Sequence, residues 1–205
     1  MSITLIIIII TVLFSLSAFN NRQLFYRMQF NAYQIHHRKE WHRFFSYGLI
    51  HADWVHLLIN MFVLYSFGRI VEGTFQELFG LKGLLLYALL YFGGVAFSTV
   101  FDYRKFKNNV HYNAVGASGA VSAVVFASIL IHPLGEIYLF LIPFGIPSFI
   151  FGILYLIYSA YMSRRSEGNI GHSAHFWGAV FGFVFTIILE PRLFSRFVES
   201  VLSFI

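Results

Sequence analysis

The stretch Gly116-Ala117-Ser118-Gly119 opens a run, 120–131, that has no charged side chain at all. Comparable apolar blocks recur along the chain, which has 205 residues, 58% of them hydrophobic and only 11% charged. Soluble domains are roughly half apolar and about a quarter charged. In hydrocarbon a helix satisfies its own backbone hydrogen bonds. The sequence therefore predicts an all-α, polytopic membrane protein.

The apolar blocks divide the chain into six expected membrane spans. We expect a six-transmembrane-helix bundle with spans at about 2–19, 55–71, 82–101, 115–132, 137–162 and 171–189. Asp53 is placed to cap the second span, and Pro133 closes the fourth. Pro143 and Pro147 fall inside the fifth, where they predict a kink or a broken entry.

We expect one membrane domain, 1–190, followed by a short and amphipathic C-terminal tail, 191–205. Between the first two spans lies a long segment, 20–54, in which cations alternate with aromatic residues. That mixture is typical of a segment lying at the membrane interface. The first span is either a retained helix or a cleaved signal peptide; its length and the absence of a preceding Lys or Arg favour the retained helix.

The composition excludes several classes of protein. The chain has no cysteine, which excludes disulfides and thiol catalysis. A net charge of +5 and a pI of about 9.5 indicate loop cations near anionic membrane lipid, and no dense basic run suggests nucleic-acid binding. We expect no cofactor. The compact size fits a multi-pass protein of a bacterial inner (plasma) membrane.

Ser118 and His175 are the candidate catalytic residues. Ser118 lies near a helix N-terminus, where free N–H groups could hold an oxyanion, and Gly116 and Gly119 clear space around it. Placing a histidine inside a membrane span costs free energy, so such a residue is a functional candidate. It could take the serine proton and return it to a leaving amine. No acidic residue falls within an expected span, which favours a dyad over a triad.

Small residues predict that these two side chains meet. Gly116 and Ala120, with Ala123 and Ala127, share one face of the fourth span, and Gly178 with Gly182 forms Gly-x-x-x-Gly in the sixth. Such faces allow close backbone approach. If they pack together, Ser118 and His175 come near each other.

Three other histidines leave alternatives open. His172 is a rival base or a partner of His175. His56 and Asn60 share one helix face, as a buried polar pair or as donors to an oxyanion. A zinc site that adds His51 to these histidines is a further alternative, but the chain has no His-Glu-x-x-His and no accompanying membrane carboxylate, so we expect no metal.

Together these motifs resemble the rhomboid family of intramembrane serine proteases. Gly116-Ala117-Ser118-Gly119 resembles its nucleophile motif, His56-Leu57-Leu58-Ile59-Asn60 its His-x-x-x-Asn helix, and Ala174-His175-Phe176-Trp177-Gly178 its Ala-His-x-x-Gly. The resemblance covers about residues 1–190.

The resemblance implies a serine endopeptidase whose substrate is a transmembrane segment of another protein. Ser118 would be the nucleophile and His175 the base, with His56, Asn60 and the Ser118 amide stabilising the oxyanion. The fifth helix and the loop at 163–170 would gate entry. Two features depart from the family: Trp41-His42-Arg43 replaces Trp-Arg, and Ser122 stands where some members carry an aromatic that stacks on the histidine.

Two expectations about sidedness conflict. One side of the membrane would hold only Arg69, Lys82, Arg192 and Arg196, and the other side the remaining ten of the 14 Lys and Arg residues. The positive-inside rule places the ten in the cytoplasm, whereas the resemblance places that side outside. We follow the resemblance.

Two other kinds of protein remain as alternatives. One is a catalytically silent rhomboid-like protein that binds membrane clients. The other is a small transporter, which would need more charge within the spans or an internal repeat.

Overall fold

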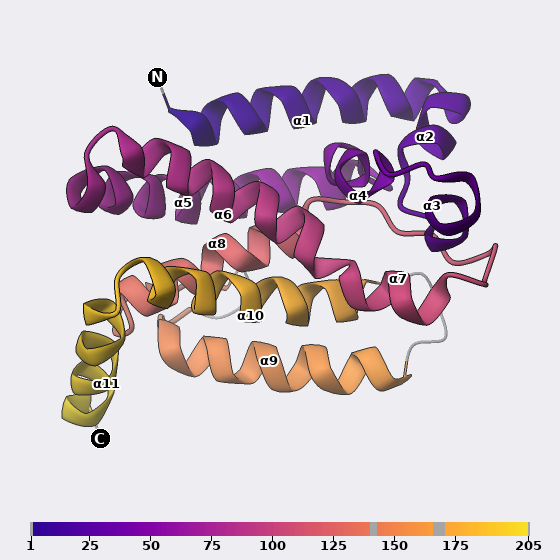
Figure 1. Ribbon diagram of the computed structural model, residues 1–205. Helices are drawn as coiled ribbons and strands as arrows, with labels where there is room; N and C mark the ends of the chain where they lie inside the picture. Colours follow the sequence, from indigo (N-terminus) through magenta and orange to yellow (C-terminus); the bar gives the residue numbers. More distant parts are fainter. Residues whose placement is uncertain (1, 140–142, 166–170, 205) are drawn as a thin grey trace.

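The computed structural model describes residues 2–139, 143–165 and 171–204, which are mostly helical. Figure 1 shows the long helices lying side by side as a bundle, with α1 on one flank and α9 on the other. The expected class, an all-α polytopic membrane bundle, is confirmed.

Four stretches are long and apolar enough to cross a membrane. They are α1 (Ile3–Asn20), α5 (Trp54–Phe79), α6 (Lys82–Ser98) continued by α7 (Val100–Phe106), and α10 (His172–Leu189). The apolar helices α8 (Ser118–Ile131) and α9 (Ser148–Arg165) occupy the other two expected places, but their apolar parts are shorter. The count of six spans therefore stays a prediction.

The fifth expected span is wrong at its start. The described residues 137–139 and 143–147 are not helical: β1 (Glu136–Ile137) pairs antiparallel with β2 (Ile146–Pro147), and α9 begins only at Ser148. Pro147 thus precedes the helix, which corresponds to the predicted broken entry and not to the kink, as expected for a residue without an N–H that disfavours helix in its predecessor. Ser148 Oγ donates to the carbonyl of Pro133 at 2.9 Å, which joins the hairpin to the end of α8.

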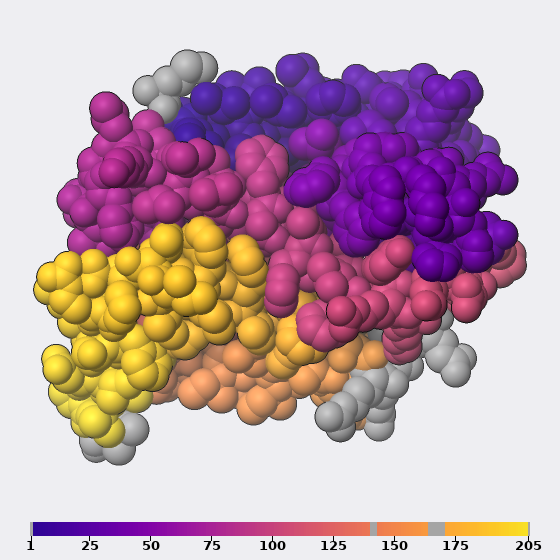
Figure 2. Space-filling view, viewed as in Figure 1, coloured from indigo at the N-terminus to yellow at the C-terminus, as the bar shows by residue number. Residues whose placement is uncertain are grey.

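The interfacial segment, 20–54, folds into α2 (Arg22–Met28), α3 (Ala32–Arg38), α4 (Arg43–Ser46) and a 3-10 turn η1 (Tyr47–Leu49). Asn21 and Asn31 cap the first two of these helices through their side-chain oxygens. Asp53 accepts from the His56 N–H at 2.8 Å, which confirms the predicted cap of α5. In Figure 2 the segment forms one continuous mass at one end of the molecule.

Helix α8 is the centre of the bundle. It packs against α5, α6, α9, α10 and α11, and every residue from Gly119 to Leu130 is buried. A helix surrounded in this way has apolar side chains on all faces and small side chains where its neighbours come close. This explains the absence of charge and the many Ala, Gly and Ser residues. The chemistry-bearing end of this helix is its N-terminus.

The other end of the bundle holds both described chain ends. The start of α1, the turn between α5 and α6, and α11 (Arg192–Phe204) all lie opposite the interfacial segment (Figure 1). Helix α11 is amphipathic, as expected for the tail, and it packs against α8 and α10. The division of the chain at residue 190 stays a prediction.

Two carboxylates are buried within helices just past the ends of the expected spans, because α5 and α7 extend beyond those spans. Glu72 is 4% exposed and accepts from the N–H groups of Ile3 and Thr4, so it holds the first turn of α1 against α5. Asp102 is 2% exposed and accepts from Tyr112 Oη at 2.8 Å. Both have structural partners of their own.

Candidate active site

Ser118 and His175 are in hydrogen-bond contact. The distance between Ser118 Oγ and His175 Nε2 is 2.6 Å, although the residues are separated by 57 positions in the sequence. Ser118 is the first residue of α8, and His175 lies in the first turn of α10. For the hydroxyl to donate, Nε2 must be unprotonated and the neutral ring must carry its proton on Nδ1. The meeting of these two residues, expected from the small-residue faces, is therefore observed.

The close crossing of α8 and α10 produces this contact. A Cβ added to Gly178 would lie 2.0 Å from the carbonyl oxygen of Gly119, and one added to Gly182 would lie 2.0 Å from that of Ala123. Only glycine permits backbones to approach this closely. The predicted small-residue face is wrong at one position, because Gly116 faces the ring of His56 and not α10.

The loop before Ser118 is shaped by Gly116 and covered by His56. Gly116 has φ +112°, a backbone conformation that side-chain-bearing residues rarely adopt, and a Cβ there would lie 2.5 Å from Cε1 of His56. The imidazole of His56 therefore packs directly over the chain that leads into the serine.

His51 fixes the same loop from the other side. It is fully buried, and its Nε2 accepts from the Ala117 N–H at 3.3 Å. Its Nδ1 lies 3.0 Å from Ser15 Oγ, which itself donates to Leu49 O and can therefore accept from Nδ1–H. Burial, with a smaller contribution from His56, lowers the pKa of His51 to about 3, so the ring is neutral and can act as this acceptor.

The candidate oxyanion residues line one cavity with the serine and histidine. Its volume is about 580 Å³, and His56, Asn60, Ser118 and His175 all contribute to its wall. Asn60 Nδ2 donates to the carbonyl of His56 at 2.8 Å, one turn back on α5, which leaves the second N–H of its amide. The N–H groups of the first turn of α8 have no partner within the helix. The same cavity wall thus carries several groups that can donate a hydrogen bond.

The length of α8 bears on the depth of the serine in a membrane. Helix α8 has 14 residues, which at 1.5 Å per residue spans roughly 21 Å. The hydrocarbon layer is about 30 Å thick. If the C-terminal end of α8 reaches one face of the membrane, Ser118 is recessed from the other face by several ångströms.

Comparison with known families shows which family the chain belongs to. The family model described as the Rhomboid domain matches residues 38–192. The chain is a member of the rhomboid family. It is 31% identical over 150 residues to the RHOMBOID-like protein 12, mitochondrial, of Arabidopsis thaliana, covering 67% of this chain and 43% of that protein. It is also 32% identical over 169 residues to the Rhomboid-like protein 11, chloroplastic, of the same plant, covering 77% of this chain and 56% of the relative.

The chain spans about half the length of these two relatives. Their names place them in mitochondria and chloroplasts, and so give no support to the expected bacterial inner membrane. The coarser expectation holds: this is a membrane-embedded, helical rhomboid domain.

The sequence missed one residue of this rhomboid site, Tyr155. Its ring, from α9, stacks on His175 with the centroids 6.4 Å apart and an interplanar angle of 28°. Its hydroxyl lies 2.6 Å from Ser122 Oγ, and Ser122 donates to the carbonyl of Ser118 at 2.8 Å. Some family members carry an aromatic residue at the position of Ser122 that stacks on the histidine. Here Tyr155 of α9 stacks on His175 instead. The polar Ser122 inside an apolar run was the only signal in the sequence.

His172 does not replace His175 in this arrangement. It is 7% exposed, and its ring meets His175 edge-on at 6.0 Å between centroids and Tyr158 at 5.7 Å. Its Nδ1 is buried with no hydrogen-bond partner among the described residues. It is therefore a neighbour of the base. In the part of the chain that the structure describes, no three His, Asp or Glu side chains form a group that could hold a metal.

Proposed function

We propose that this rhomboid protein is an intramembrane serine endopeptidase that cleaves peptide bonds in or near transmembrane segments of other proteins. The observation that carries the proposal is the 2.6 Å distance between Ser118 Oγ and His175 Nε2 at the N-terminus of a buried helix. A serine is a weak nucleophile until an adjacent base activates it. A neutral imidazole in hydrogen-bond reach is such a base.

In the first half of the reaction the serine is acylated. Ser118 Oγ attacks the scissile carbonyl carbon while its proton passes to His175 Nε2. The carbonyl oxygen becomes an oxyanion, to which the Ser118 N–H and the side chains of His56 and Asn60 would donate hydrogen bonds. The C–N bond then breaks, and His175 gives the proton to the leaving amine, which leaves an acyl-enzyme on Ser118.

In the second half water releases the acyl group. His175 takes a proton from water as the water oxygen attacks the ester, and the proton returns to Ser118 Oγ as the ester C–O bond breaks. The product is a carboxylic acid, and the site is restored. The two buried carboxylates, Glu72 and Asp102, accept hydrogen bonds from Ile3 and Tyr112, so the proposed proton transfers use Ser118 and His175 alone.

The cavity supports a membrane-embedded substrate. Its wall includes Ile59, Phe62 and Ile70 of α5, which are 58%, 72% and 42% exposed on the side of the bundle that faces lipid. Most of the remaining wall is apolar and comes from α8, α9 and the β hairpin. An extended segment from a neighbouring membrane helix could therefore enter between α5 and α9 without first crossing water. Of the proposed gate, residues 166–170 lie outside the described residues.

The proposal is tested by reconstituting the full chain in vesicles with a panel of single-span reporter proteins. We expect cleavage within or beside the span, with the new termini located by mass spectrometry, and none with Ser118→Ala. Cleavage that persists in Ser118→Ala would overturn the assignment of the nucleophile. The alternative, a silent client-binding protein, predicts capture of the reporter without cleavage by the wild type as well.

A further inference from the structure

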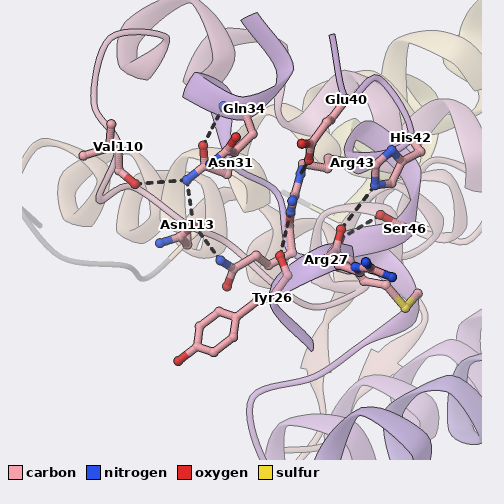
Figure 3. Close-up of polar contacts among 12 residues, drawn as sticks. Tyr26, Arg27, Asn31, Gln34, Glu40, His42, Arg43, Ser46, Val110 and Asn113 are labelled. Carbon is pink, nitrogen blue, oxygen red and sulfur yellow. Dashed lines mark hydrogen bonds and ion pairs between the residues drawn. The ribbon is translucent and has the colours of Figure 1, made fainter. Parts of the chain in front are cut away.

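A polar cleft of about 980 Å³ opens in the interfacial segment, away from Ser118 and His175. Residues of α2, α3, α4 and the turns between them form most of its wall, and Val110 and Asn113 of the loop after α7 complete it. Figure 3 shows Arg43 reaching toward Glu40 on one side and the amides of Asn31 and Asn113 closing the other. None of these residues takes part in the proposed catalysis.

The frame of the cleft is rigid. Arg43 is buried, with Nε 2.6 Å from Glu40 and Nη1 donating to the carbonyls of Tyr26 and Gln29 at 2.8 and 2.7 Å. Asn31 Nδ2 donates to the Asn113 side chain at 2.8 Å. These contacts join the parts of the interfacial segment to one another and to the loop after α7, so the cleft keeps its shape without a ligand.

The charges in the cleft are unbalanced. Arg27, Arg38 and Arg43 line it, and Glu40 is the one carboxylate in its wall. Glu40 is paired with Arg43, whereas the guanidinium groups of Arg27 and Arg38 have no hydrogen-bond partner among the described residues. Two free guanidinium groups in a preformed cleft favour an anion, and their planar forks fit phosphate oxygens.

The cleft also contains a polar group that lacks a partner. Gln34 lines it, and Oε1 of its amide is buried without a hydrogen bond in the part of the chain that is described. Buried amide groups are normally paired. A ligand hydroxyl or a water could supply the missing hydrogen bond.

The position of the cleft indicates where the anion comes from. The segment joins the end of α1 to the start of α5, so it lies where two spanning helices leave the membrane. Tyr26, which lines the cleft, and Trp41 and Trp54 elsewhere in the same segment are 59%, 52% and 58% exposed. Tyr and Trp gather at the level of lipid headgroups. A lipid phosphate is therefore the nearest anion at that depth.

We infer that this cleft binds the phosphate of an anionic membrane lipid, held by Arg27 and Arg38. The lipid would keep the interfacial segment at a fixed depth in the membrane interface. The inference does not depend on proteolysis, since no catalytic side chain is involved.

The test uses the full chain carrying Ser118→Ala, which makes the result independent of cleavage. The detergent-purified protein is titrated with short-chain phosphatidylglycerol or phosphatidylcholine, and bound lipid is counted by native mass spectrometry. We expect a preference for phosphatidylglycerol. Juxtamembrane cations contribute about 1 kcal/mol each. The preference should therefore fall about fivefold when one arginine is replaced, and about 25-fold in Arg27→Gln/Arg38→Gln.

The matched control is Arg22→Gln/Arg104→Gln, which removes the same charge from exposed positions outside the cleft. It should keep the preference. An equal loss in both double variants would overturn the inference in favour of diffuse surface charge, and no preference in the parent protein would overturn it outright. Arg27→Lys/Arg38→Lys keeps the charge but loses the planar forks, so its preference should lie between those of the parent and the glutamine variant, which gives a readout even if the glutamine variant proves unstable.

A soluble competitor separates the two sources of phosphate. Glycerol 3-phosphate should displace the lipid only weakly, because it lacks the acyl chains that hold a lipid at the interface. Displacement at a concentration similar to that of the lipid would contradict the lipid assignment and identify a site for soluble phosphate.

Discussion

Gly178 of α10 lies against the carbonyl oxygen of Gly119 in α8, where an added Cβ would be only 2.0 Å away. The atom in the way belongs to the backbone, so no side-chain rotation can relieve the clash. The same crossing places His175, three residues before Gly178, against Ser118. The distance between base and nucleophile is therefore set by glycine-mediated packing.

Gly178→Ala should separate the two helices and thereby weaken both stability and activity. Overpacking typically costs about 1–3 kcal/mol, and backbone contact places this position at the upper end or beyond. We expect a lowered melting temperature and loss of reporter cleavage. Gly73→Ala in α5 is the control, because an added Cβ there meets nothing within 4 Å. Equal behaviour of the two variants would contradict this account of the crossing.

The oxyanion donors should be less essential than the dyad. Removing one donor typically lowers the rate by roughly 10²–10³, so Asn60→Ala should retain measurable cleavage. Ser118→Ala and His175→Ala should retain essentially none. The comparison uses initial rates on one reporter with matched amounts of folded protein. If folded Asn60→Ala proves as inactive as Ser118→Ala, the division of roles is wrong.

Tyr155 should position His175 through its ring more than through its hydroxyl. Tyr155→Phe keeps the stacking on His175 and loses only the contact with Ser122, so we expect a loss of less than about tenfold, since one hydrogen bond contributes about 1 kcal/mol. Tyr155→Leu removes the aromatic face and should lower kcat further and change its pH profile. Rates and pH profiles of the two variants are compared with those of wild type. A similar loss in both would show that the hydroxyl is the important part.

His51 should make the protein sensitive to acid. Its pKa is lowered from 6.5 to about 3 by burial, so below pH 6.5 the unfolded chain binds a proton that the folded protein excludes. Stability should fall as the pH drops from about 6.5 toward 3, by up to about 1.4 kcal/mol per pH unit from this group. Thermal unfolding of Ser118→Ala from pH 7 to 4 measures the slope. His51→Gln, with a neutral amide, should be less stable at pH 7 but have a flatter slope; an unchanged slope would rule out His51 as its source.

The orientation in the membrane can be decided with a C-terminal reporter. Arg192–Phe204 lies at the end of the bundle opposite the interfacial segment (Figure 1). Following the family resemblance, we expect the C-terminus inside and the cleft and serine nearer the outer face. A fusion to a phosphatase active only outside the cytoplasm should be silent. An active fusion would support the opposite orientation, which the positive-inside rule predicts from the distribution of Lys and Arg.

The sequence predicted the features that depend on local pattern. Long apolar blocks indicate the helical bundle, and small residues spaced four apart predict that α8 and α10 touch, which brings Ser118 and His175 together. Asp53, a polar residue at the start of an apolar block, predicts the cap of α5. Each of these follows from the helix period or from the chemistry of helix ends.

The features that were missed depend on pairing between distant segments. The paired strands Glu136–Ile137 and Ile146–Pro147 lie in a stretch apolar enough to resemble a helix start, and only their pairing shows otherwise. Tyr155 is one of the 12 tyrosines in the chain, and nothing in its neighbourhood marks it as facing His175. Glu72 lies past the expected end of its span, and its partners come from residues 2–4, far away in the chain. Periodicity carries no information about such contacts.

The most direct test of the central claim is covalent labelling of Ser118. The detergent-purified wild type is treated with a fluorophosphonate, and the modified residue is located by peptide mass spectrometry beside Ser118→Ala and His175→Ala. We expect a single modification on Ser118 that is absent from Ser118→Ala and strongly reduced in His175→Ala. A folded wild type that does not react, or one whose Ser118 reacts equally well without His175, would contradict an activated serine at this site.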